Sequence, residues 1–194
     1  MKDQKKDMIV AVHESGHAVM ARFFNLWVRE VSIETNKGKY FGRTLYYGAT
    51  QTSTNELVKE HTIYACLGGA VASFLYDDCA TQYSYEDDVR SCLPYIRKFR
   101  KLATIEDLIP YLTITGNLLS EPSRWGAVLD LAEALIKQRI LVDQQVDEII
   151  NNTTHRETPK LSLEGKVLYI QKADAQSCKP VKKPVSLKKA DIYT

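Results

Sequence analysis

Apolar residues recur at every third or fourth position through the first part of the chain. They are Met8, Ile9, Val12, Val19, Met20, Phe23 and Phe24. In an α-helix this spacing gathers the side chains on one wide stripe, and the polar residues between them take the other face. We therefore predict a helix from Lys2 to Phe24 that buries one side.

The next segment changes from a helical to an alternating period. WVREVSIE, residues 27–34, alternates apolar and polar positions, and YFGRTLYY, residues 40–47, is rich in aromatic and β-branched residues. The intervening TNKGK supplies turn residues. These features predict a β-hairpin.

A capping pattern and an apolar stretch mark the following helix. Ser53 and Glu56 form the S-x-x-E pattern typical of a helix N-terminus, and we expect the helix to continue to about Tyr76. Its nearly uncharged part, residues 62–76, has 15 residues, whereas a helix needs about 20 to cross a bilayer. We predict a buried helix and no membrane span.

Acidic residues and prolines indicate further helices. Asp87 and Asp88 suit the positive N-terminal end of a helix within residues 84–101, and Pro94 is expected to kink or restart that helix. Three later helix boundaries are expected, at Pro110, Pro122 and Asp143, the last as an N-cap. The chain is predicted to be mainly α, of the α+β class, with one small β-hairpin or sheet.

Length and composition are those of one globular domain. The chain has 194 residues, of which 44% are hydrophobic and 26% charged. Residues 156–194 carry nine Lys and Arg against four Asp and Glu, which leaves 17 against 20 for residues 1–155. We expect a domain over 1–152 and a basic tail over 153–194. The tail is expected to be solvated rather than bound to nucleic acid or a membrane surface, with a short strand at 165–172.

The cysteines and the missing motifs limit where the protein is expected to act and whether it uses ATP. The four cysteines, at positions 66, 79, 92 and 178, form no CxxC pair, so neither a zinc ribbon nor a disulfide framework is indicated. No signal-like apolar run follows the charged first residues. A GxxxxGK[ST] phosphate loop is also missing from the sequence. We expect an ATP-independent, cytoplasmic protein with reduced thiols.

The first predicted helix carries the stretch VHESGHAVMARF, which combines two histidines with a glutamate and a glycine. His13 and His17 are four residues apart, so their side chains lie one above the other and can bind one metal ion. Glu14 projects about 100° further round, where it can reach a water on that metal as a general base. Gly16 costs about 1 kcal/mol in a helix relative to alanine, which indicates the close approach of another backbone.

A hydrolytic zinc site needs a third protein ligand, with the fourth position left to water. A metzincin would have glycine and histidine where Met20 and Phe23 stand, and intramembrane zinc proteases need spanning helices. A glutamate such as Glu56 or Glu60 stays open as the third ligand. The remaining histidines have no ligand spacing and are interpreted as ordinary polar residues: His61 and His155.

HESGHA resembles the HEAGHA helix in the peptidase domain of FtsH-type zinc proteases. Other segments follow in the same order: VSIE, FGRT, LGGAVASFLY in place of the family's LGGRxAE segment, an aspartate before an aliphatic residue, and AVLDLAEALIKQRILVDQQVDEII as a closing helical pair. The resemblance covers roughly residues 8–150. It implies a zincin-like helical peptidase fold, Zn²⁺ as cofactor, and Asp88 as the third ligand with Asp87 in reserve.

The chain departs from this family at three points. Ser73 stands where the family has a glutamate, so that carboxylate cannot support a metal ligand here. Pro94 falls within a helix that is continuous in the family. The family's ATPase module and transmembrane anchor are missing, so the resemblance implies a peptidase domain without an attached unfolding motor.

The leading hypothesis is a zinc-dependent metalloendopeptidase. His13, His17 and Asp88 would hold Zn²⁺, and Glu14 would take a proton from the attacking water. Substrates are expected to be unfolded proteins or flexible segments, which could pair as a strand with the hairpin edge near residues 40–47.

Two alternatives belong to other classes of protein. Ser73 and Pro94 suggest a catalytically inactive binding or regulatory protein that keeps the peptidase-like fold. The basic tail suggests association with nucleic acid, which would be sensitive to salt. The sequence indicates no oligomeric state.

Overall fold

The structure is a computed structural model that describes residues 2–36, 39–48, 55–76, 85–97, 105–153 and 155–157. Its elements are α1 (Lys2–Phe23), β1 (Trp27–Asn36), β2 (Lys39–Tyr47), α2 (Glu56–Tyr76), α3 (Tyr85–Arg97), the 3-10 turn η1 (Ile105–Leu108), α4 (Ile109–Leu119), α5 (Pro122–Gln138), β3 (Ile140–Val142) and α6 (Asp143–Asn151). Helices account for 74% of the described residues, which confirms the mainly α prediction.

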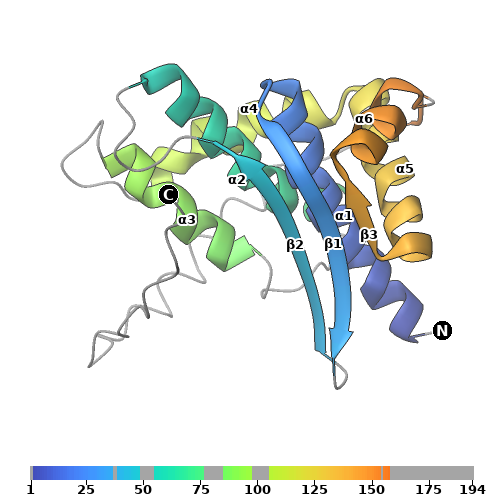
Figure 1. Cartoon of the computed structure of the whole chain (residues 1–194). Helices are drawn as coiled ribbons and strands as arrows, with labels where there is room; N and C mark the ends of the chain where they lie inside the picture. The colour runs from blue at the N-terminus through green and yellow to red at the C-terminus, as the bar shows by residue number, and fades with distance from the viewer. Residues whose placement is uncertain are drawn as a thin grey trace, which may run out of the picture.

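β1 lies in the middle of a three-stranded antiparallel sheet of order β2-β1-β3 (Figure 1). The predicted hairpin is confirmed, and its strands are paired from Trp27 opposite Tyr47 to Asn36 opposite Lys39. β3 was not predicted. It has only three residues, too few to show an alternating pattern, and it is a strand because β1 offers it a free edge.

One face of the hairpin packs toward α1 and places three β2 residues there. Residues opposite each other on paired strands share a face of the sheet. The three β1 residues on this face are buried at 2% exposure or less, and their β2 partners are Gly42 opposite Ile33, Thr44 opposite Val31, and Tyr46 opposite Val28. The same face of β2 therefore presents Gly42, Thr44 and Tyr46 to the helices.

α1 is the central helix. It contacts α2, α5 and both hairpin strands, and Figure 1 shows α2 and α5 to either side of it. Residues 11–20 are consequently buried all round the helix rather than along a single stripe. Phe23, which the pattern placed in the stripe, is 42% exposed and lies under the Arg124 guanidinium, 4.5 Å from the ring centre.

Glycines allow α1 and α2 to touch backbone to backbone. A Cβ added to Gly16 would lie 2.3 Å from the Gly68 carbonyl oxygen, and a Cβ added to Gly68 would lie 2.4 Å from the Gly16 oxygen. Neither position has room for a side chain. The close backbone approach expected from Gly16 is therefore confirmed.

α2 begins at a different cap from the one predicted. The helix starts at Glu56, and the Asn55 side chain caps it by accepting a 3.2 Å hydrogen bond from the Val58 amide. Ser53, the predicted capping residue, lies outside the described residues. Asparagine is as good an N-cap as serine, and it stands nearer the start of the helix. The predicted end at Tyr76 is confirmed.

The predicted N-cap of α6 is wrong by one residue. Asp143 is the first helical residue, and Val142 occupies the capping position because it belongs to β3. The Gln145 side chain reaches back and accepts a 3.0 Å hydrogen bond from the Val142 amide. Gln145 thus supplies half of a capping box whose other half is missing.

The prolines behave differently from one another. α3 continues from Tyr85 to Arg97 through Pro94, so the expected restart is wrong. Pro94 lies three residues before the end of α3, and the neighbouring Ile96 is buried in the core, which holds the last turn in place. Pro110 and Pro122 lie in the first turns of α4 and α5, as expected.

The folded part of the chain extends past the predicted boundary at residue 152. The Thr153 hydroxyl donates to Asp130 on α5 (2.6 Å), and Arg156 pairs with Asp130 and Glu133. The predicted strand at 165–172 lies outside the described residues. Among the helices that the structure describes, none combines the length and apolar character needed to cross a bilayer.

Candidate metal centre

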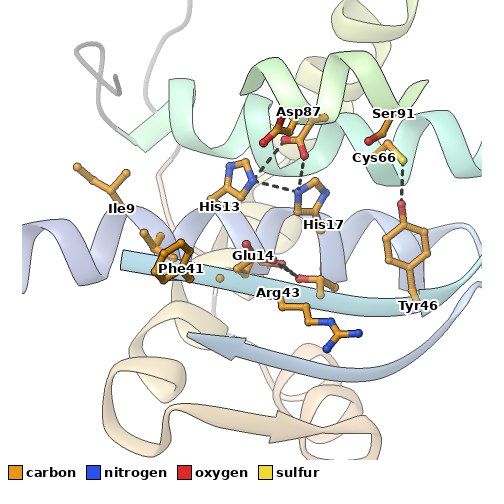
Figure 2. Close-up of a pocket in the computed structure, with 14 residues that line it drawn as sticks. Ile9, His13, Glu14, His17, Phe41, Arg43, Tyr46, Cys66, Asp87 and Ser91 are labelled. Atoms are coloured by element: carbon orange, nitrogen blue, oxygen red, sulfur yellow. Dashed lines mark hydrogen bonds and ion pairs between the residues drawn. The ribbon is translucent and has the colours of Figure 1, made fainter. Parts of the chain in front are cut away.

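Two elements far apart in the sequence bring three side chains to one point. α1 supplies His13 and His17, and α3 supplies Asp88. The two histidine Nε2 atoms are 3.1 Å apart, and each lies 3.3 Å from one oxygen of the Asp88 carboxylate (Figure 2). In the part of the chain that the structure describes, this is the one group of three or more His, Cys, Asp or Glu residues arranged to hold a metal ion.

These separations suit a tetrahedral zinc site. Zinc lies about 2.0–2.1 Å from histidine nitrogen and carboxylate oxygen, so two ligands at a tetrahedral angle are about 3.3–3.4 Å apart. The 3.1 Å between the two Nε2 atoms is close to that edge length, and each nitrogen lies 3.3 Å from a different Asp88 oxygen, Oδ2 for His13 and Oδ1 for His17. Asp88 Oδ2 is buried and accepts no hydrogen bond from any described residue, as expected for an oxygen reserved for a cation.

Each imidazole is held from its other nitrogen. His17 Nδ1 lies 2.8 Å from the Ala65 carbonyl oxygen, and His13 Nδ1 lies 3.1 Å from the Ser73 hydroxyl. With a metal ion bound, a proton on each Nδ1 would donate to these oxygens and leave both Nε2 lone pairs for the metal. Ser73 therefore contacts His13 through a hydroxyl, at the position where the resemblance led us to expect no carboxylate.

Gly69 leaves room for the two rings over α2. A Cβ at this position would lie 2.3 Å from His17 Nε2 and 2.8 Å from His13 Nε2. Gly69 therefore belongs to the site, although it offers no ligand atom. Sequence analysis placed Gly69 in a buried helix but had no signal for this contact, which joins residues 52 positions apart.

Burial and the Asp88 carboxylate shift the pKa values of the two histidines in opposite directions. Burial and the neighbouring His17 lower the pKa of His13 to about 4. Burial also lowers the pKa of His17, but the charge and hydrogen bond of Asp88 and the charge of Glu14 outweigh it and raise that pKa to about 10. The site therefore attracts one positive charge at neutral pH, beside two carboxylates.

Glu14 lies next to the histidines without joining them. Its carboxylate is buried at 6% exposure and is 2.7 Å from the Thr44 hydroxyl on β2. A Cβ at Gly42 would lie 2.3 Å from Glu14 Oε1, so β2 approaches this carboxylate closely only because Gly42 has no side chain. Burial raises the pKa of Glu14, and the charge of His17 and the Thr44 bond lower it by less. Such a carboxylate can both take up and release a proton.

A cavity of about 440 Å³ opens over these residues. One end is lined by Ile9 and Phe41, and the other by Tyr46, Cys66 and Ser91, with the metal-binding group between them (Figure 2). The candidate metal centre is therefore open to solvent through this cavity, beside β2.

The other acidic and histidine candidates lie away from the ligand group. Asp87 is exposed and lines the rim of the cavity, so Asp88 is the carboxylate that faces the histidines. Glu56 pairs with Lys59, and Glu60 accepts a 2.9 Å hydrogen bond from Tyr64. His61 stacks on Phe24. His155 is exposed.

The protein is thus mainly helical, and its candidate metal centre combines a His-His-Asp group with an adjacent buried glutamate and an open cavity. No protein-family model matches the chain, and no curated protein matches it by sequence.

Proposed function

We propose that this protein is a zinc-dependent endopeptidase. The observation that carries the proposal is the convergence of His13, His17 and Asp88, whose ligand atoms lie within 4.8 Å of one another, beside the buried Glu14. A structural ion pair would not need two imidazoles with facing Nε2 atoms, an orphaned carboxylate oxygen and an open cavity at the same point.

His13, His17 and Asp88 would hold the metal, and Glu14 would handle the proton. Zinc held by these residues would lower the pKa of a water to about 7 and polarise the scissile carbonyl. Glu14 takes a proton from the attacking water and returns it to the leaving amine, a double role that its raised pKa supports. Thr44 holds Glu14 by donating to Oε2, so the carboxylate reaches the water through Oε1.

β2 offers the route by which a substrate would bind. One side of β2 pairs with β1, and β2 is an edge strand of the sheet among the described residues. Phe41, Gly42, Arg43 and Thr44 line the cavity. An extended chain that pairs with this edge passes over the site, and backbone pairing selects unfolded or flexible segments with little regard to sequence. We propose a cytoplasmic location, because Cys66 and Cys92, the cysteines that the structure describes, are free thiols.

The first test replaces Glu14 by glutamine and measures cleavage of unfolded casein by tag-free protein. Loss of the general base should reduce the rate about a hundredfold or more, while zinc stays near one per chain by elemental analysis. Glu34→Gln is the matched control, because Glu34 is exposed on β1, and it should cleave like wild type. Casein cleavage by Glu14→Gln at the wild-type rate would mean that a contaminating protease is at work.

The second test compares Asp88→Ala with Asp87→Ala for zinc content after dialysis. Asp88→Ala removes an oxygen that lies 3.3 Å from a histidine nitrogen and should lose most of the zinc. Asp87→Ala should keep it. A wild-type protein that takes up no zinc would exclude the peptidase proposal.

The alternative of an inactive binding protein depended on Ser73 and Pro94. Ser73 provides a hydrogen-bond partner for His13, and α3 continues through Pro94. Neither residue now favours that alternative over the peptidase. Nucleic-acid binding by residues 156–194 stays the less favoured alternative to a solvated tail, tested by salt-sensitive binding that disappears when those residues are removed.

A further inference from the structure

A group of sulfur and hydroxyl side chains lies at one end of the cavity, outside the metal-binding group. Cys66 on α2 is partly exposed and lines the cavity, and the Tyr46 hydroxyl on β2 lies 3.0 Å from its sulfur (Figure 2). The proposed peptidase mechanism uses neither residue.

A second thiol lies against the first. Cys92 on α3 is fully buried at the contact of α3 with α2. The sulfur of Cys92 is also 3.8 Å from the Ile63 carbonyl oxygen, which belongs to the turn of α2 that carries Cys66. Cys92 therefore lies against the turn of α2 that carries Cys66.

We infer that Cys66 and Cys92 form a thiol pair that peroxide oxidises reversibly to a disulfide, and that the disulfide weakens metal binding at the adjacent site. Cys66 is the sulfur that peroxide reaches first, because it lines the cavity while Cys92 is buried. The hydrogen bonds from Cys92 and Tyr46 favour its thiolate and outweigh burial, so the pKa of Cys66 is lowered to about 7.

The chemistry balances with hydrogen peroxide as the oxidant. The Cys66 thiolate attacks one peroxide oxygen, the O–O bond breaks, and the leaving hydroxide takes up the thiol proton as water. The product is a sulfenic acid at Cys66. The sulfur of Cys92 then attacks the Cys66 sulfur and displaces hydroxide, which leaves as water with the Cys92 proton. Two thiols and one peroxide become one disulfide and two waters.

The disulfide would act on the metal ligands through the two helices. Cys92 is four residues after Asp88 on α3, so both lie on the same face of that helix. Cys66 directly follows Ala65, whose carbonyl oxygen holds His17. A disulfide bond of about 2.05 Å is shorter than any non-covalent contact between two sulfurs, so forming it draws α3 toward α2 and displaces Asp88 from the histidines.

The test uses the full chain with the remaining cysteines replaced, as Cys79→Ser and Cys178→Ser. Brief treatment with hydrogen peroxide should remove both thiols and yield a peptide that joins residues 66 and 92 in mass spectrometry. In the Cys92→Ala variant, Cys66 should instead be trapped by a sulfenic-acid reagent without any cross-link. Two thiols that still react after peroxide treatment and unfolding would overturn the inference.

The second measurement is zinc affinity before and after oxidation. Oxidised protein should bind zinc about tenfold more weakly, a thiol reductant should restore the affinity, and Cys66→Ala should be unaffected by peroxide. A cross-link with unchanged zinc affinity would overturn control of the site. This effect on zinc rests on the proposed function, but the cross-link does not: protein that never binds zinc would refute the peptidase while the peptide map still decides the thiol chemistry.

Discussion

Each imidazole of the candidate metal centre is held at Nδ1, the ring nitrogen that faces away from Asp88. For His17 the partner is a backbone carbonyl of α2, which no substitution can remove. For His13 the partner is the Ser73 hydroxyl, 3.1 Å away. The orientation of the His13 ring can therefore be changed by a mutation at Ser73 that leaves the candidate metal ligands intact.

Replacing Ser73 by alanine should lower zinc affinity about tenfold, because the His13 ring loses the partner that selects its tautomer. Zinc affinity would be measured by competition with a fluorescent chelator. Ser15→Ala is the matched control: Ser15 is also a fully buried serine, but its hydroxyl has no hydrogen-bond partner among the described residues. Equal affinities in the two variants would contradict the role given to Ser73.

Zinc affinity should rise with pH between about pH 6 and 9, by roughly tenfold per unit. The pKa of His17 is raised to about 10, so this ring carries a proton throughout the range, and zinc must displace it. The pKa of His13 is lowered to about 4, so His13 contributes no proton there. Acid therefore weakens binding and base strengthens it. Chelator-buffered titrations at several pH values would measure the slope, and a flat profile would contradict the charge assigned to His17.

At the scale of elements, the crossing of α1 and α2 sets the depth at which the metal ligands lie. The backbones touch at Gly16 and Gly68, and Gly69 lies under the two imidazoles. A wider crossing would move His13 away from Ser73 and His17 away from Ala65. The close packing of α1 against α2 therefore also fixes the orientation of the two histidine rings.

Replacing Gly16 by alanine should destabilise the fold by up to about 2 kcal/mol. Alanine improves helix propensity by about 1 kcal/mol, but its Cβ would lie 2.3 Å from a backbone oxygen that cannot rotate away, and overpacking of a core costs about 1–3 kcal/mol or more. Urea unfolding with a chelator present would exclude any contribution from metal. Leu57→Ala, at a 59% exposed site on α2, should change stability by less than about 0.5 kcal/mol. A stabilised Gly16→Ala protein would contradict the observed crossing.

At the scale of the whole molecule, the segment after α6 returns to the first turn and middle of α5. The Arg156 amide donates to the Pro122 carbonyl, and its guanidinium pairs with Asp130 and Glu133. These contacts link the end of the described chain to a helix that packs on α1. Residues 155–157 thus help to hold α5 in place.

A chain that ends at residue 152 should be less stable than one that ends at 157. The lost contacts are one backbone hydrogen bond, the Thr153 hydroxyl bond and ion pairs that are about a third exposed at Arg156. Because solvent screens such pairs, the expected loss is about 1–2 kcal/mol, or several degrees in melting temperature. Thermal unfolding would measure it. Identical melting temperatures would mean that residues 153–157 contribute nothing to stability and that the domain ends at 152, as predicted.

Sequence alone was sufficient wherever the relevant interactions are local. Helical spacing identified α1 and the i, i+4 relation of His13 and His17, and alternation followed by turn residues identified the hairpin. Gly16 indicated a close helix crossing because glycine is costly inside a helix. Each of these features depends on residues within one or two turns, or within one hairpin.

Tertiary structure decided everything that depends on contacts across the chain. It showed that Asp88, 71 positions after His17, faces the histidines, and that Ser73 lies 60 positions from its partner His13. The burial that raises the pKa of Glu14 likewise comes only from packing. So does the pairing of β3 with β1. A sequence specifies such contacts through the sum of many weak burial terms, and no single local pattern records which side chains will meet.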